Sequence, residues 1–253
     1  GAGSHFDLAS LRLLADALLQ EPSPDPSEAL QYADYAEWRW NLVEDEPDHP
    51  GVNFWKALDE AEQPTLQLSL EAPSGAGFAP ARQALALPAE FPRHPALTSA
   101  LMLAAWAAVL GRLAGQQQVP LTLIHESRGA ELDTVLGVFE QCLPLNIDLD
   151  PQATLLQQSQ QLAASVERTA GWQDYYTRDL TTGYAFAWRS GDARERYADA
   201  LMGPVKACLN VRQLPDSLHA SLSYDCHTLS AEAARSLGEQ WLQLLQGALA
   251  EPQ

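Results

Sequence analysis

Apolar and polar residues alternate with a period of two in short stretches of the second half of the chain. Leu145, Ile147 and Leu149, for example, alternate with the polar Asn146 and Asp148. Successive side chains of a strand point to opposite faces of a sheet, so this pattern predicts a strand with one buried face. Such alternation, or a run of β-branched residues and leucine, predicts strands over residues 82–87, 119–124, 142–149, 185–188, 205–211 and 218–224.

Other segments place apolar residues at helical spacing. Near the start, Leu8, Leu11, Leu14 and Leu18 share one face, and Asp7 precedes them where an N-cap belongs. Further helices are predicted over residues 31–45, 54–58, 96–113, 153–168 and, after a Ser230 cap, up to 250. The helix over 96–113 is apolar almost all round, which indicates burial.

Strands that alternate with helices indicate an α/β fold. The segment 71–80 is rich in proline, glycine and serine, which is typical of a linker, and it is the best candidate for a domain boundary. With 253 residues, of which 46% are hydrophobic, the chain is long enough for one large or two small domains with a real core.

The charge of the chain excludes one class of partner. With 33 acidic and 15 basic residues the net charge is −18, which argues against nucleic acid binding. We interpret the acidity as a solvated surface; attraction of a basic partner is the alternative. Three cysteines without a CxxC spacing suit a reducing compartment, and the apolar runs are too short to cross a membrane, so a cytoplasmic location is expected.

Common cofactor and catalytic motifs are missing from the sequence. There is no GxGxxG, Gly-rich Lys-Ser/Thr loop, HExxH, Cys/His cluster or GxSxG, so no dinucleotide, nucleotide or metal site is predicted. His125, at the end of a predicted strand and beside Glu126, is the most interesting histidine. It is either a polar residue that ends the strand or a ligand or base at the mouth of a sheet.

Five phrases resemble motifs of the condensation domains of nonribosomal peptide synthetases, in the family's order. The phrase DLASLRLL at 7–14 is similar to the end of HHxxxDGxS, QYADYAEW at 31–38 to QYxDYAxW, and FWKAL at 54–58 to YWxxxL. The phrases IHESR at 124–128 and LGVFEQCLPL at 136–145 are similar to the pair GRNRPE and IGxFVNTLPLR. Residues 218–249 are similar to the closing strand and helix of the family. Together they span nearly the whole chain.

The resemblance implies the chloramphenicol-acetyltransferase-like fold, which has two lobes, each a sheet covered by helices, with a tunnel between them. Carrier proteins deliver phosphopantetheine-bound substrates from both ends. The second histidine of HHxxxDG serves the amine that attacks the donor thioester, within hydrogen-bond reach. Residues 81–253 would form the C-terminal lobe with a mixed sheet, 72–80 a linker, and 6–71 remnant helices of the N-terminal lobe and the inter-lobe connection; 1–5 we interpret as a cloning remnant.

This sequence departs from the family at the catalytic motif. If Asp7 is the motif's aspartate, the two histidine positions are Ala2 and Gly3, Leu8 stands for the glycine, and His5 is out of register. The resemblance therefore predicts a truncated domain, whether by nature, by design or by proteolysis.

The first functional hypothesis is a non-catalytic module that packs against synthetase domains or recruits a partner or carrier protein. The second is an acyltransferase half that completes its site with a separate N-lobe or a second copy, because half of a two-lobe fold should expose a sheet edge and apolar surface. The third is a small-molecule binding protein. No cofactor is expected to bind directly, since phosphopantetheine resides on the carriers.

Some site residues are carried over from the family motifs. Asp7 and Arg128 are predicted to form a structural ion pair within about 4 Å; a solvated strand end is the alternative for Arg128. The candidates for lining the tunnel are His125, Gly137, Phe139, Gln141, Pro144, Trp172, Asp174 and Tyr175. Gln141 replaces the asparagine of FVN, which would move the amide by one methylene. For Trp172, Asp174 and Tyr175 the alternative is a helix-terminal turn with half-buried aromatic rings.

Overall fold

The computed structural model describes residues 8–19, 30–60, 64–72, 77–91, 97–126, 128–178, 183–190 and 205–250. The chain divides into two compact units. The first, here the helical unit, comprises Gly1–Glu62, His125–Gln141 and Gly171–Asp179; the second, the sheet unit, comprises Gln63–Ile124, Cys142–Ala170 and Leu180–Gln253. The domain bounds predicted from the sequence, with a linker at 72–80, stay a prediction.

The sheet has six described strands in the order β1-β6-β5-β4-β2-β3. β1 pairs antiparallel with β6, β6 antiparallel with β5, and β5 and β2 both parallel with β4. The predicted mixed sheet is therefore confirmed. The strands are β1 (Pro80–Leu85), β2 (Gln118–Glu126), β3 (Glu140–Asp148), β4 (Tyr184–Ser190), β5 (Ala207–Gln213) and β6 (Leu218–Asp225).

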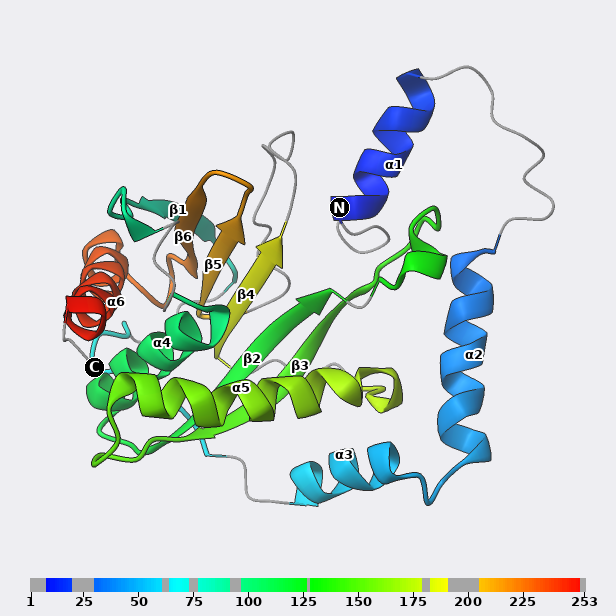
Figure 1. Ribbon diagram of the computed structural model, residues 1–253, viewed down its shortest axis with the longest axis horizontal. Coiled ribbons are helices and arrows are strands. Elements are labelled where there is room, and N and C mark those ends of the chain that lie inside the picture. Colours follow the sequence, from blue (N-terminus) through cyan, green and yellow to red (C-terminus); the bar gives the residue numbers. More distant parts are fainter. Residues whose placement is uncertain are drawn as a thin grey trace. The chain divides into compact units, whose positions relative to one another are not determined.

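Three long helices belong with the sheet: α4 (Ser99–Ala114), α5 (Leu155–Gly171) and α6 (Ala231–Ala250). Figure 1 shows α4 and α5 crossing one face of the sheet, with α6 beside α4. α4 is buried almost all round, as its composition predicts. Two buried indoles connect these elements: Trp106 of α4 donates its Nε1–H to the Ala185 carbonyl of β4 at 3.1 Å, and Trp241 of α6 donates to the Met102 carbonyl of α4 at 3.0 Å.

Helix ends follow capping chemistry. The Oγ1 of Thr98 accepts from the Leu101 N–H at 3.1 Å, which starts α4 three residues later than predicted. Gly115 ends it in the left-handed region with φ 68°, a conformation that favours glycine. The predicted Ser230 cap of α6 is confirmed, because its Oγ accepts from the Ala233 N–H at 3.1 Å.

Pro144 lies within β3, a buried position near the middle of the strand. β3 is the last strand in the sheet order. A proline has no N–H for a strand ladder and is therefore confined to edge strands, strand starts or bulges. Leu145 and Ile147 are buried and Asn146 and Asp148 are less so, as the alternation predicts.

A buried acid–base cluster fastens the segment before β1 to the sheet. The Glu71 carboxylate, 7% exposed, lies 2.6 Å from the Lys206 ammonium and accepts from the Tyr184 hydroxyl at 2.8 Å. It also accepts from the Leu68 N–H at 2.9 Å, and the ammonium donates to the Leu66 carbonyl at 3.1 Å. Burial, and secondly the neighbouring carboxylate, raise the pKa of Tyr184, so its hydroxyl stays a donor.

The helical unit contains α1 (Leu8–Leu19), α2 (Tyr32–Asp45) and α3 (Pro50–Glu60), with the short 3-10 helices η4 (Ala130–Leu132) and η5 (Gln173–Tyr175). α3 is longer than the predicted 54–58, because it starts at Pro50, and proline suits the first turn of a helix. Asp7, the predicted cap of α1, lies outside the described residues. Of the helices that the structure describes, none is both long and apolar enough to span a membrane.

Candidate functional site: a locked loop and an acidic aromatic cavity

The hydroxyl of Ser10 on α1 is saturated by the loop that follows β2. It donates to the Gly137 carbonyl at 2.7 Å, accepts from the Gly137 N–H at 2.8 Å and accepts from Nη2 of Arg128 at 2.8 Å. Ser10 is fully buried. A hydroxyl has one donor and two acceptor sites, so these three bonds use its whole capacity and fix the loop to α1. The bonds among Ser10, Arg128 and Gly137 are called the lock below.

Arg128 closes the same loop on itself. Its Nη1 donates to the carbonyls of Leu132 and Val135, and its guanidinium lies 4.2 Å from the centre of the Phe139 ring. Arginine suits this position because its planar fork serves several acceptors while its face stacks on an aromatic ring. The predicted partner Asp7 lies outside the described residues, so the Asp7–Arg128 ion pair stays a prediction.

Gly137 has a steric reason to be glycine. A Cβ at this position would overlap the ring of Tyr32. That close approach lets Tyr32 and Tyr35 of α2 pack on Phe139, with ring centres 5.3 Å and 5.1 Å from it. Val135 and Leu132 complete this cluster, in which Phe139 is fully buried.

Arg39 of α2 holds the turn around η5. Its guanidinium donates to the backbone carbonyls of Gln173, Asp174 and Tyr176, and to Oε1 of Gln141 at 3.4 Å. These carbonyls follow the end of α5, so one side chain serves backbone acceptors of the turn, among them the Gln173 carbonyl, which also accepts from the Tyr176 N–H at 3.0 Å.

The aromatic residues around η5 pack on α3 and the residue before it. The indole N–H of Trp55 donates to the Trp172 carbonyl at 2.7 Å. The Tyr175 ring is stacked on His49 with centres 4.1 Å apart, and its hydroxyl lies 3.1 Å from Nε2 of that histidine. Trp172 and Tyr175 are half-buried.

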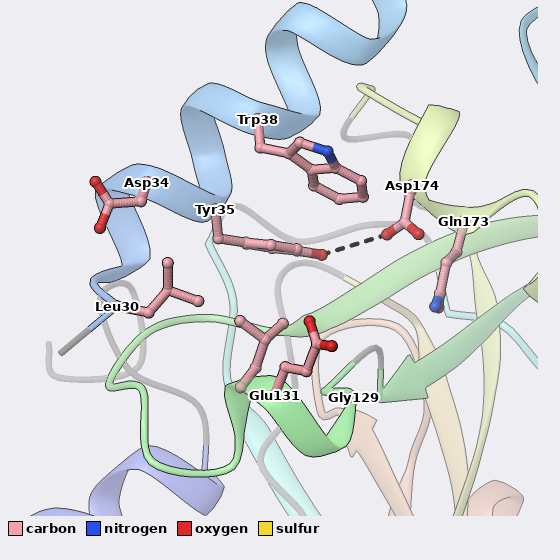
Figure 2. Close-up of a pocket in the computed structure, with 9 residues that line it drawn as sticks. Leu30, Asp34, Tyr35, Trp38, Gly129, Glu131, Gln173 and Asp174 are labelled. Carbon is pink, nitrogen blue, oxygen red and sulfur yellow. Dashed lines mark hydrogen bonds between the residues drawn. The ribbon is translucent and has the colours of Figure 1, made fainter.

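A cavity of about 750 Å³ opens within the helical unit, between the N-terminal half of α2, η4 and η5. Figure 2 shows its wall: Tyr35 and Trp38 from α2 face Glu131, Gln173 and Asp174. The Tyr35 hydroxyl donates to the Asp174 carboxylate at 3.4 Å. The remaining lining residues are Leu30, Asp34, Gly129 and Leu132.

His125, at the end of β2, has a perturbed imidazole. Burial lowers the pKa of His125 from its ordinary value of 6.5, and the Asp174 carboxylate opposes that effect. Among the described residues no three His, Cys, Asp or Glu side chains are grouped so that they could hold a metal ion.

Replacing His125 with glutamine is expected to flatten the pH dependence of the free energy of unfolding between about pH 7.5 and about pH 5.5. The folded chain binds fewer protons than the unfolded chain as the pH falls through 6.5, so the parent loses stability in that window. Urea titrations at the two pH values measure the slope. The exposed His219, changed to glutamine, is the control; an unchanged slope in the His125 variant would contradict the prediction.

Of the eight candidates for the tunnel, Asp174 lines the cavity. Gly137 belongs to the lock and Phe139 to the aromatic cluster. Gln141 contacts Arg39, Pro144 lies in β3, and Trp172 and Tyr175 pack at η5. Their role in a tunnel stays a prediction. Sequence reasoning missed the contributions of Ser10, Arg39 and Trp38. For Ser10 a signal existed, because the resemblance aligns it with the serine of DGxS, and for Trp38 because it stands at the tryptophan of the phrase similar to QYxDYAxW. Nothing marked Arg39 beyond its place on an amphipathic helix.

Comparison with known proteins decides the family. The sequence profile of the condensation domain matches residues 9–185. The chain belongs to the condensation-domain family.

The relatives of this condensation domain are long synthetases. It is 29% identical over 147 residues to malpibaldin synthetase of Mortierella alpina, covering 54% of this chain and 3% of that protein. It is 28% identical over 185 residues to a linear gramicidin synthase of Brevibacillus parabrevis, covering 68% of this chain and 4% of that one. The chain thus corresponds to a small part of each curated relative.

Solved structures confirm the fold. The X-domain in the complex of the X-domain and OxyB from teicoplanin biosynthesis superimposes with a TM-score of 0.82 at 17% identity, over 98% of this chain and 66% of that one. The prediction of a chloramphenicol-acetyltransferase-like, mixed α/β fold is therefore confirmed, as is the family of nonribosomal peptide synthetase condensation domains.

Proposed function

We propose that this condensation-type polypeptide does not form amide bonds by itself and serves as a docking module for a carrier protein or a neighbouring synthetase domain in peptide natural-product biosynthesis. It acts in the cytoplasm and binds no cofactor directly; phosphopantetheine resides on the carrier. An acyltransferase half that needs a second polypeptide is the alternative. The predicted domain bounds, the Asp7–Arg128 ion pair and the tunnel roles belong to the same proposal.

The observation that carries the proposal is the register of the HHxxxDGxS motif. The bonds of Ser10 to Arg128 and Gly137 join three residues that match three family motifs, which supports the assignment of Ser10 as the serine of DGxS. Counting back from it, the two histidine positions are Ala2 and Gly3. Neither residue has a group that accepts a proton, so these two positions, which lie in the segment 1–5 interpreted above as a cloning remnant, supply this polypeptide with no base for the attacking amine.

Docking is supported by exposed apolar side chains in the helical unit. On α2, Trp40 is 59% and Trp38 49% exposed, and on α1 Leu18 is 79% exposed. Tryptophan that stays in water in the free protein is a typical anchor of protein interfaces. The similar X-domain was solved in a complex with OxyB, which lends further support to a role in binding a protein.

The docking test is titration of the immobilised chain with phosphopantetheinylated carrier domains cut from linear gramicidin synthase and from malpibaldin synthetase. Saturable binding is expected with a Kd on the order of 100 µM or tighter. Trp40→Ser should weaken it about fivefold, because it removes an aromatic anchor. Glu37→Gln, at an exposed position of the same helix, is the control and should bind like the parent. No saturation by any carrier up to about 1 mM would overturn the docking proposal.

A further inference from the structure

The cavity of the helical unit has carboxylates that the docking function does not use. Its volume of about 750 Å³ falls within the usual range of small-molecule pockets. Apolar side chains come from Leu30 and Leu132, and polar groups come from three different segments of the chain. This combination of an apolar body with a few converging polar groups is typical of a binding site.

The charged groups that line the cavity are all acidic. Asp34, Glu131 and Asp174 line it, and among the residues that the structure describes no Lys, Arg or His does. In Figure 2 the carboxylates of Glu131 and Asp174 face the interior beside the Tyr35 hydroxyl, whereas Asp34 points outward. Asp34 is also engaged at the start of α2, where it accepts from the Gln31 N–H at 2.8 Å. Two carboxylates therefore remain directed at an occupant.

An aromatic wall faces these carboxylates. Tyr35 is buried, and Trp38, which is stacked on it with ring centres 5.9 Å apart, is 49% exposed. An indole face attracts cations more strongly than the other aromatic rings. The neighbouring Arg39 lies 5.8 Å from the Tyr35 ring and donates to backbone carbonyls around η5. The indole of Trp38 is thus the ring that is open to a cation from outside.

We infer that this cavity binds an organic cation, an ammonium or guanidinium group on an apolar arm. The cationic head lies between the carboxylates of Glu131 and Asp174 and against the indole of Trp38, and the arm lies against the apolar side chains of Leu30 and Leu132. The acidic chain, with a net charge of −18, attracts such a ligand from a distance. The inference shares Trp38 with the proposed docking of a carrier protein, whereas Glu131 and Asp174 play no part in that docking.

The test uses n-pentylammonium as the free amine, the peptide acetyl-Gly-Lys-Gly-amide as a side chain on a polypeptide, and 1-pentanol as the neutral counterpart. Ligand-observed saturation-transfer NMR gives each Kd for the full chain. Both cations are expected to saturate one site, and the alcohol to bind at least about tenfold more weakly. If the peptide binds more tightly than the amine, the natural cation is a side chain of a partner protein. If the amine binds as tightly as the peptide or more tightly, the natural cation is a small molecule.

Two variants place the site. Glu131→Gln and Trp38→Leu should each weaken the binding of the cation about threefold, and together about tenfold. Asp133→Asn, exposed on the same loop but outside the cavity, is the matched control and should leave the Kd unchanged. Circular dichroism and thermal melts verify that each variant is folded. Binding of 1-pentanol as tight as that of the cation, no binding of either cation, or equal effects of the control and the site variants would overturn the inference.

Discussion

Replacing Arg128 with methionine is expected to lower the stability of the helical unit by about 3 kcal/mol. The change removes the donors for the Leu132 and Val135 carbonyls and for the Ser10 hydroxyl at once. Methionine keeps an apolar side chain over the Phe139 ring, so the lost stability comes from the missing guanidinium group and not from lost packing. Arg128→Lys keeps the positive charge but not the planar guanidinium, and should lower the stability of the helical unit by about 2 kcal/mol.

Hydrogen exchange followed by mass spectrometry is suited to this prediction, because it reads the two units separately. Peptides from α2 and from the loop 128–139 should exchange faster in the variant, while peptides from α4 and α6 should not change. Arg112→Met is the control; this arginine is exposed and bonded to Gln240 in the sheet unit, and its loss should stay within about 0.5 kcal/mol. Unchanged protection of the loop in the Arg128 variant would show that the lock contributes nothing.

Replacing Glu71 with alanine is the second large effect, an expected loss of about 3 kcal/mol from the sheet unit. The side chain is 7% exposed and serves three donors, from Lys206, Tyr184 and Leu68. Tyr184 is fully buried, so its hydroxyl has no water to replace the carboxylate. The Lys206 side chain is 30% exposed and can turn to solvent. The expected loss of stability is therefore at the lower end of the range for breaking a buried ion pair.

A double-mutant cycle separates the ion pair from the rest of the cluster. Glu71→Ala, Lys206→Met and their combination are compared by urea denaturation, with a coupling of about 1 to 2 kcal/mol expected between the two sites. Glu239→Ala, at an exposed position of α6, is the matched control and should change the free energy of unfolding by less than about 0.5 kcal/mol. A coupling indistinguishable from zero would mean that the two charges are held in place by the backbone alone.

The strands and the long helices could be predicted from the sequence because their signal is local. The strand over 142–149 follows from alternation, and the burial of α4 from its almost uniformly apolar composition. The observed start of a helix differs from the predicted start where a capping side chain fixes it, as Thr98 does for α4. The start of α3 at Pro50 was missed, although proline at the first turn is a sequence signal.

The site was predictable only where a motif marked it. Arg128, Gly137 and Phe139 stand in family phrases, and the structure brings them together in the lock and the aromatic cluster. The bonds of Ser10 and Arg39 join residues about one hundred or more positions apart in the chain. No periodicity or spacing encodes such approaches, and the cavity beside Trp38 depends on them.

The central claim, that this polypeptide does not form amide bonds alone, is tested most directly by a single-turnover assay. One carrier domain is loaded with an aminoacyl donor and a second with an acceptor amine; equimolar chain is added, and intact-protein mass spectrometry follows both carriers. A complete condensation domain with both motif histidines is the positive control. We predict that no dipeptidyl carrier forms and that the donor disappears only at its background rate of hydrolysis. Dipeptidyl carrier formed by this chain alone, at a rate near that of the control, would contradict the claim.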